Sequence, residues 1–153
     1  MIVGVVGSRD GANLEDVSAF MSALRRRDPS IVVVSGGARG VDRTAENMWI
    51  EMGGRVVSFR PVKVTENHWV IERLDLGPGI KGTRTVEEPS YADFTSAAVA
   101  RNLLIASECD KLIVFQRDGS PSSGSSITAG FAKDQGKDVF VYTPAAPFRR
   151  VAA

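Results

Sequence analysis

The sequence predicts an α/β protein of the Rossmann-like, doubly wound class, with a mainly parallel five-stranded sheet covered by helices on both faces. Two observations carry this prediction. Short apolar runs alternate with longer segments that have helical spacing, as in the repeated strand–helix units of parallel sheets. The runs also end in turns rich in small residues, and in 35–40 such a turn leads directly into the next helix. Right-handed crossovers then leave an open, twisted sheet as the expected arrangement.

The strands are predicted from apolar runs that lack the alternation of a half-exposed strand. Continuous runs of this kind are typical of strands that are buried on both faces of a parallel sheet. The five predicted strands occupy 2–6, 31–34, 55–59, 111–115 and 138–142.

The helices are predicted from apolar spacing and from the residues at their ends. In the first, Leu14, Val17 and Met21 share one face, Asn13 is the expected N-cap, and Asp28-Pro29 ends the helix. Glycine closes two of the others, because it adopts the left-handed conformation that follows a helix. The remaining predicted helices occupy 41–52, 94–107 and 127–135.

Regular spacing breaks down between 61 and 93. Glycine and proline are frequent in this stretch, which predicts an irregular insertion with one short helix near His68–Leu74. A loop of this length in a compact domain covers a site or an interface, or is mobile. The tail after Pro144 is also expected to be loose.

Bulk composition limits the partners that this chain is expected to have. Lysine and arginine number 19 against 18 aspartate and glutamate, for a formal net charge of +1. No global field therefore draws the chain to nucleic acid or to a membrane, and neither is an expected partner. The length of 153 residues predicts a single domain over 1–153, because domains commonly run about 100–200 residues.

Cysteine and histidine each occur once, as Cys109 and His68. An intrachain disulfide is therefore excluded, and the three or four ligands of a usual zinc site are not available. We predict neither a metal nor a cofactor. The start of the chain, MIVGVVGSRD, resembles a strand rather than a signal peptide. No apolar stretch approaches the roughly 18 residues of a membrane span, so we expect a soluble, cytoplasmic chain.

Three loops rich in small residues are predicted to meet where the strands end, which is where open α/β sheets bind ligands. Glycine lets the backbone approach a phosphate closely, and the N–H groups at a helix N-terminus favour an anion. Serine and arginine side chains add further donors. The loop residues are Gly7, Ser8 and Arg9, then Ser35, Gly36, Gly37, Ala38, Arg39 and Gly40, and finally Ser123, Gly124, Ser125 and Ser126.

Each of these loops also has a purely structural interpretation, since tight turns after strands require glycine for their geometry alone. The prediction of a ligand site therefore rests on three loops meeting. None of them is a Walker P-loop, and no Gly-x-Gly-x-x-Gly follows the first strand, which disfavours an ordinary NAD dehydrogenase. Asp42 either caps the helix or binds a ribose hydroxyl. Arg101-Asn102, in the third helix, is either solvated or part of the site.

The order and spacing of four blocks identify a resemblance to the SLOG superfamily. The blocks are Gly7-Ser8-Arg9, the segment from Ser35 to Asp42 continuing to Ala45-Glu46, the segment from Ala97 to Asn102, and the small-residue loop before Gly130-Phe131-Ala132. This Rossmann-like group includes the Lonely Guy phosphoribohydrolases, the DNA-processing protein DprA/Smf and the YspA-like proteins, and the YspA-like branch is the most similar. The resemblance extends from Met1 to about Tyr142, and it is poor from about 63 to 93.

The resemblance implies a nucleotide-derived ligand, with phosphate at the loops and Arg101 near the ribose or phosphate. In the phosphoribohydrolases an arginine on this helix and a glutamate after the last loop perform catalysis. Arg101 matches the arginine, but Thr128 stands at the position of the glutamate. A threonine hydroxyl does not replace a carboxylate at an oxocarbenium-like carbon. We therefore expect a sensor or carrier of a nucleotide-like small molecule, without turnover.

Two alternatives stay open at this point. The first is an N-glycosidic hydrolase of nucleoside monophosphates, with a displaced acid such as Glu46, Glu108 or a carboxylate of the insertion. The second is single-stranded nucleic-acid binding like that of DprA, for which Trp69, Tyr91 and Phe94 are candidate stacking residues. The net charge near zero argues against the second. A molybdenum-cofactor carrier is a further possibility within the superfamily, and the resemblance also implies a homo-oligomer, commonly a dimer.

Overall fold

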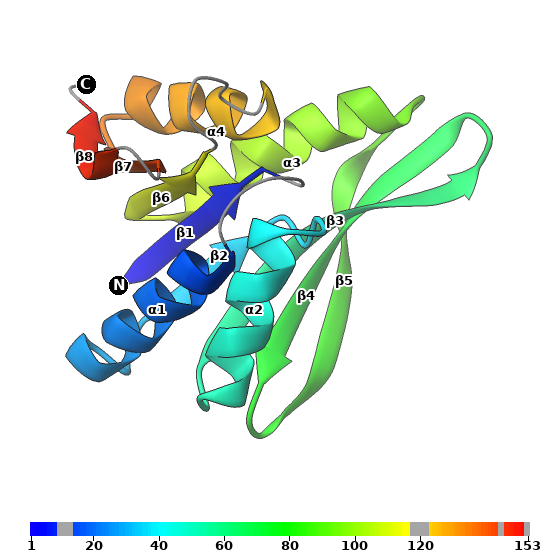
Figure 1. Ribbon diagram of the computed structural model, residues 1–153. Coiled ribbons are helices and arrows are strands. Elements are labelled where there is room, and N and C mark those ends of the chain that lie inside the picture. The colour runs from blue at the N-terminus through cyan, green and yellow to red at the C-terminus, as the bar shows by residue number, and fades with distance from the viewer. Residues whose placement is uncertain (9–13, 117–122, 144–145, 152–153) are drawn as a thin grey trace.

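The computed structural model describes residues 1–8, 14–116, 123–143 and 146–151, and shows a single eight-stranded sheet between two layers of helices (Figure 1). The strands are β1 (Ile2–Gly7), β2 (Val32–Ser35), β3 (Arg55–Thr65), β4 (His68–Gly77), β5 (Ile80–Tyr91), β6 (Lys111–Phe115), β7 (Asp138–Thr143) and β8 (Ala146–Val151). The helices are α1 (Leu14–Arg27), α2 (Val41–Glu51), α3 (Phe94–Glu108) and α4 (Ser123–Asp134).

The strands lie in the order β5-β4-β3-β2-β1-β6-β7-β8. Five neighbouring strands, β3-β2-β1-β6-β7, pair in parallel. This confirms the predicted parallel sheet. β4, β5 and β8 are antiparallel additions at its two edges. Because the chain moves outward from β1 to β5 and then returns to β6 on the other side of β1, the strand order reverses at β1.

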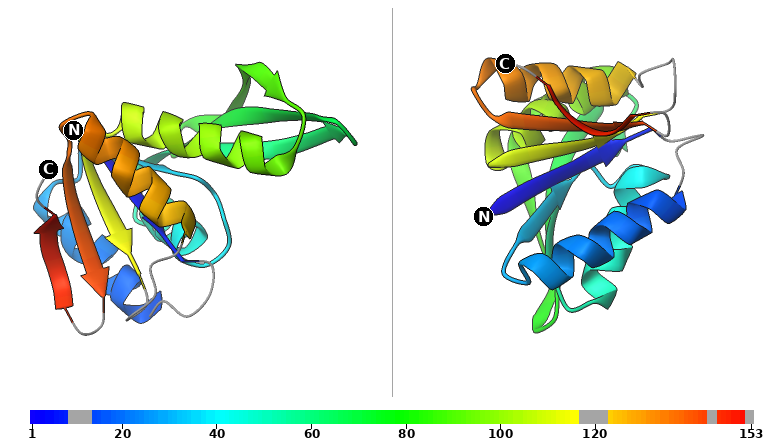
Figure 2. Two further views of the ribbon diagram at one scale, coloured as in Figure 1. Left: turned by 90° about the horizontal axis from the view of Figure 1, so that it is seen from above. Right: turned by 60° about the vertical axis from the view of Figure 1, so that its left-hand side comes forward.

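The helices cover both faces of the sheet, as the sequence predicts (Figure 2). α1 and α2 pack on one face around Val17, Met21 and Trp49. Trp49 is fully buried, and its indole N–H donates to the Ile31 carbonyl at 3.2 Å, which satisfies the only polar group of its side chain. α3 and α4 pack on the opposite face, where Ile105 joins the second apolar cluster.

The prediction of an irregular insertion with a short helix is wrong for 61–93. β3 continues to Thr65, β4 returns antiparallel to it, and β5 pairs with β4. Glycine predicts loop in this segment, but Gly77 and Gly79 lie at the turn between β4 and β5, with φ of 142° and 75°. Such positive φ values favour glycine, so these residues reverse a strand rather than interrupt one.

Two other boundaries differ from the prediction. The tail is not loose throughout, because β8 pairs antiparallel with β7 and so satisfies the backbone groups along that edge. α4 begins at Ser123 rather than at Ile127, so the residues predicted as the third loop form its first turn. In the part of the chain that the structure describes, no helix is both long and apolar enough to cross a membrane.

Candidate functional site

The candidate site lies at the carboxyl ends of β1 and β2, beside the N-terminus of α2. Two of the predicted loops meet there. Val41 N–H donates to the Ser8 carbonyl at 3.4 Å, which joins the turn after β1 to the start of α2. Gly7 has no space for a side chain, since an added Cβ would lie 2.5 Å from the Phe115 carbonyl oxygen.

Asp42 ties these two loops together. Its Oδ1 accepts from Gly7 N–H and its Oδ2 from Gly36 N–H, both at 3.2 Å. The helix-cap role considered for Asp42 is therefore wrong. The N-cap of α2 is Gly40, which has a φ of 88° and no side-chain cap. A carboxylate that holds two loop amides leaves those amides in one orientation, and the loops keep their relative position.

Burial raises the pKa of Asp42 from 3.8 to about 7, because the charged carboxylate loses its hydration. The nearby Arg101 guanidinium and the backbone hydrogen bonds of Gly7 and Ala38 lower the pKa, while the negative charge of Glu46 raises it further. The protonation of this carboxyl group therefore changes near neutral pH.

Arg101 approaches the same loop from α3. Its Nη1 donates to the Gly36 carbonyl at 2.7 Å and its Nε to Asn102 Oδ1 at 3.0 Å. Both side chains are buried, so the solvated interpretation of this pair is wrong. An added Cβ on Gly36 would lie 2.7 Å from Arg101 Nη1 and 3.0 Å from Asp42 Oδ2, which explains the glycine. Arg101 of α3 and Asp42 of α2 thus both bind the loop, from helices on opposite faces of the sheet.

A second buried charged group supports the next residue of the loop. The sequence offers Glu46 as a candidate replacement acid but gives no sign of its partners Arg60 and Ser58. Glu46 of α2 is 1% exposed and accepts from Arg60 Nη2 at 2.8 Å and from Ser58 Oγ at 2.9 Å. Arg60 Nε donates to Ser58 Oγ at 2.9 Å. Because both carboxylate oxygens are occupied, Glu46 is not a free replacement for a missing catalytic acid. The arginine lies directly against Gly37, whose φ is 65°.

Ser8 and Ser35 are buried, and neither hydroxyl has a hydrogen-bond partner. Unpaired buried hydroxyls cost free energy, so these two serines make the loops less stable than fully paired residues would. Two arginines lie at the outer rim. Arg39 is exposed, and the exposed Arg43 reaches back to the Gly37 carbonyl through Nη2 at 2.8 Å.

The remaining predicted residues lie in α4 or outside the described part of the chain. Arg9 lies outside the described residues. Ser123 and Gly124 begin α4, and Ser126 in the same turn is partly exposed. Ser125 and Thr128 are buried in α4, which packs beside α3 on the face opposite α2.

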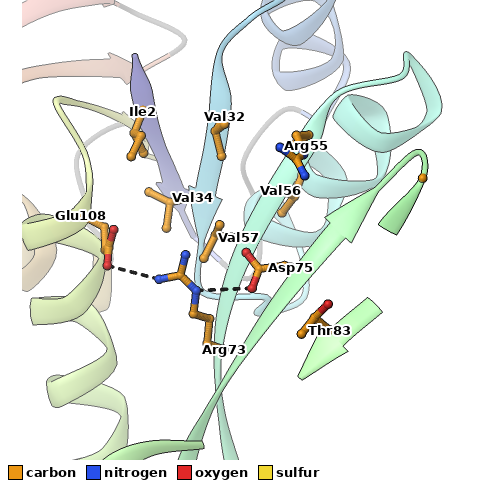
Figure 3. Close-up of a pocket in the computed structure, with 11 residues that line it drawn as sticks. Ile2, Val32, Val34, Arg55, Val56, Val57, Arg73, Asp75, Thr83 and Glu108 are labelled. Carbon is orange, nitrogen blue, oxygen red and sulfur yellow. Dashed lines mark hydrogen bonds and ion pairs between the residues drawn. The ribbon is translucent and has the colours of Figure 1, made fainter. Parts of the chain in front are cut away.

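The structure also contains a cavity of about 590 Å³ at the other end of the sheet (Figure 3). It lies at the starts of the central strands, where Ile2, Val32 and Arg55 contribute to its lining. Its charged wall is internally paired, because Arg73 donates to Asp75 at 3.4 Å and to Glu108 at 3.3 Å. This cavity is distinct from the loop site. The described residues contain no group of three or more potential metal ligands.

A Rossmann-like sheet whose first two loops are held by a buried aspartate and a buried arginine defines a SLOG-type domain, as the sequence predicts. The chain belongs to the family of DNA recombination-mediator protein A, whose model matches residues 1–151. It is 29% identical to the DNA processing protein DprA of Streptococcus pneumoniae over 90% of this chain and 49% of that protein. The chain therefore spans about half the length of this relative.

Solved structures share the fold of this chain. The X-ray structure of DprA from Streptococcus pneumoniae superposes with a TM-score of 0.65 and 25% identity, over 91% of this chain and 49% of that one. DprA from Helicobacter pylori, described for its single-stranded DNA binding mode, has a TM-score of 0.64 and 19% identity over 92% and 64%. The protein TM1055 has a TM-score of 0.58 and 20% identity over 90% and 71%.

These comparisons overturn two predictions from the sequence. The expected sensor or carrier of a nucleotide-like small molecule is wrong, because the family and its named relatives are DNA processing proteins. The expectation that nucleic acid is not a partner is wrong for the same reason. Net charge misled here because it averages over the whole surface, whereas a nucleic-acid site needs positive charge only where the strand lies.

Proposed function

We propose that this chain binds single-stranded DNA and that the sugar–phosphate backbone of the strand lies on the loops at the ends of β1 and β2. The observation that carries the proposal is the geometry of Gly36, whose backbone N–H and carbonyl are each fixed by a buried charged side chain. A loop held in this way presents its remaining backbone groups without further ordering, which lowers the entropic cost of binding.

The chemistry of the loops suits a phosphate. The N-terminus of α2 favours negative charge, and the exposed side chains of Arg39 and Arg43 add positive charge beside it. These groups contact the backbone rather than base edges, so they predict binding that does not depend on sequence.

The relatives support the choice of single strands. DprA of Helicobacter pylori is described as binding single-stranded DNA, and this chain shares its fold. Membership of the YspA-like branch, a single domain over 1–153 and a homo-oligomer remain predictions from the sequence. A dimer would place two loop sites on one strand and raise its apparent affinity.

Fluorescence anisotropy with a labelled oligothymidine tests the proposal. We expect the 153-residue chain to bind the single strand more tightly than a duplex of the same length. The affinity should fall with salt, with a slope of about −0.7 for each phosphate neutralised. No binding of the single strand, or equal affinity for the duplex, would contradict the proposal.

A matched pair of arginine variants locates the site. Arg39→Ala removes an exposed arginine from the loop itself, whereas Arg55→Ala removes an exposed arginine from the opposite end of the sheet. We expect the first to weaken binding and reduce the salt slope by about 0.7, and the second to leave both unchanged. Equal losses would indicate diffuse electrostatic binding instead.

A further inference from the structure

The ribbon formed by β3, β4 and β5 extends past the N-terminus of α3 (Figures 1 and 2). β3 runs parallel to β1 and β2, so its continuation from Arg60 to Thr65 leaves the sheet at the same edge as the loop site. The ribbon pairs β3 with β4 as far as Thr65 and His68. The extended ribbon therefore lies next to any single-stranded DNA that binds at the loops.

Three aromatic residues gather where this ribbon meets α3. Trp69 of β4 packs edge-to-face with Phe94, the first residue of α3, with ring centroids 5.4 Å apart and planes at 63°. Tyr91, the last residue of β5, pairs with Trp69 in the strand register. Phe94 is 38% exposed, and Trp69 and Tyr91 are partly exposed. We call these three residues the aromatic platform.

The aromatic platform lies on the face of the sheet that α3 covers. Along β4, Trp69 and Ile71 point to one face because side chains alternate along a strand, and Ile71 is buried in the cluster that includes Ile105 of α3. An edge-to-face pair does not cover both faces of both rings, so aromatic surface remains for a third ring to contact.

The distance between the aromatic platform and the loop site can be estimated along two elements, α3 and β3. Along α3, Phe94 lies seven residues before Arg101, or about 10 Å at 1.5 Å per residue. Along β3, Arg60 lies three residues before Lys63, again about 10 Å, and Lys63 pairs with Trp69. A strand that covers only about 4 nucleotides, at the short end of single-strand binding sites, spans this separation.

A small side chain lies between the two ends along α3. Ala98 lies on the same stripe of α3 as Phe94 and Arg101, at spacings of four and three residues. Lys63 adds a positive charge, because its exposed pair with Glu66, at 3.0 Å, is held only weakly. Glu87 is a carboxylate on the same face, so stacking rather than charge must supply most of the attraction there.

We infer that the aromatic platform of Trp69, Tyr91 and Phe94 is a stacking site for unpaired bases of the strand whose backbone lies on the loops. This inference rests on the proposed function and adds the site that receives the bases. Stacking uses the face of a base, which every base has, so the platform binds without reading sequence. It also favours single strands over duplex, because paired bases already have both faces covered.

The test compares an oligothymidine with an abasic oligomer of the same length and charge. Both carry the backbone that the loops bind, but only the first carries bases. We expect wild-type protein to bind the oligothymidine at least about fivefold more tightly, since stacking on one aromatic residue is worth about 1–3 kcal/mol. Trp69→Leu with Phe94→Leu keeps apolar contacts between the ribbon and α3 but removes the aromatic faces, and it should abolish this preference.

Two further variants keep the test specific. Trp69→Phe retains a stacking ring and should restore most of the preference. Val86→Ala removes a 54% exposed apolar side chain from the same ribbon and should change nothing. Val86 pairs with Glu72, and Glu72 pairs with Arg60, which places Val86 on the opposite face from Trp69.

Tryptophan emission provides a second readout. Trp49 is fully buried, so quenching by added oligothymidine reports on Trp69 and should disappear in Trp69→Phe. The two proposals fail separately. If wild-type protein binds both oligomers equally, or the double variant keeps the preference, the platform is wrong and the loop site stands. If neither oligomer binds, the proposed function is wrong and the platform with it.

Discussion

Asp42 and Arg101 hold Gly36 from two helices that lie on opposite faces of the sheet. Asp42 Oδ2 accepts from Gly36 N–H at 3.2 Å, and Arg101 Nη1 donates to the carbonyl of the same residue at 2.7 Å. Both side chains are buried, and the Gly36 backbone links the two. The loop after β2 is therefore anchored to both helical layers.

Replacing Arg101 by methionine should loosen this anchor. The Gly36 carbonyl loses its donor and the Asp42 carboxyl group loses the guanidinium that stabilises its charge. We expect a loss of about 1–3 kcal/mol in the free energy of unfolding and weaker oligonucleotide binding, measured by urea denaturation and anisotropy. Leu103→Ala, at an exposed position on the same helix, is the control. Unchanged binding in Arg101→Met would show that the loop does not need the anchor.

Stability should depend on pH through Asp42. Its pKa is raised from 3.8 to about 7 in the folded chain, so between these values the folded chain holds a proton that the unfolded chain has released. Raising the pH across this window therefore favours unfolding. Asp42→Asn removes this contribution, and we expect its free energy of unfolding to fall less steeply from pH 5 to pH 7 than that of wild type.

Asp28→Asn is the control for the pH experiment. Hydrogen bonds from Ser30 lower the pKa of Asp28, so this carboxylate is almost fully ionised in both states from pH 5 to pH 7. Its removal should leave the slope unchanged. Parallel curves for wild type and Asp42→Asn would contradict the raised pKa.

The central sheet was predictable because its signals are local. Each parallel strand is a continuous apolar run, and each helix has its own spacing and its own ends. The meeting of Gly7, Ser8 and the 35–40 loop followed from the rule that parallel strands end at one edge. The ribbon was missed because glycine and proline, both at the turn between β4 and β5 and within β3 and β5, outweighed the weaker alternation of its strands. Residues on both faces of β4 are partly exposed.

The supporting contacts could not be predicted from local pattern. Glu46 lies on the same buried face of α2 as Val41, Ala45 and Trp49. Its partner Arg60 is 14 residues further along the chain, on β3. Asp42 reaches Gly7 across 35 residues. Such pairs depend on which strands become neighbours, and one sequence carries no direct signal of that choice.

Gly37→Ala should damage the loop more than an ordinary glycine substitution. Gly37 has a φ of 65°, and an added Cβ would lie 2.3 Å from Arg60 Nε. We expect a loss of about 1–3 kcal/mol from backbone strain alone, with weaker oligonucleotide binding because Arg60 must move. Gly130→Ala in α4 is the matched control, since its added Cβ meets nothing within 4 Å. It should be neutral or stabilising by up to about 1 kcal/mol, and equal losses in the two variants would contradict the argument.

The Glu46–Arg60 pair should show strong coupling in a double-mutant cycle. Arg60→Met leaves a carboxylate that is 1% exposed with only the Ser58 hydroxyl as a partner. Breaking a buried pair costs about 3–5 kcal/mol, and we expect the low end because the Arg60 side chain is 27% exposed. Adding Glu46→Leu removes the stranded charge, so the double variant should lose less than the sum of the single variants.

The exposed pair Lys63–Glu66 supplies the comparison for this cycle. Its side chains are 47% and 87% exposed, and water screens their charges, so its coupling should stay below about 1 kcal/mol. Urea denaturation of the four proteins in each cycle gives both values. Additive losses at Glu46 and Arg60 would mean that the pair contributes nothing as a unit. The position of Gly37 would then depend on the backbone of its loop rather than on the charged group beneath it.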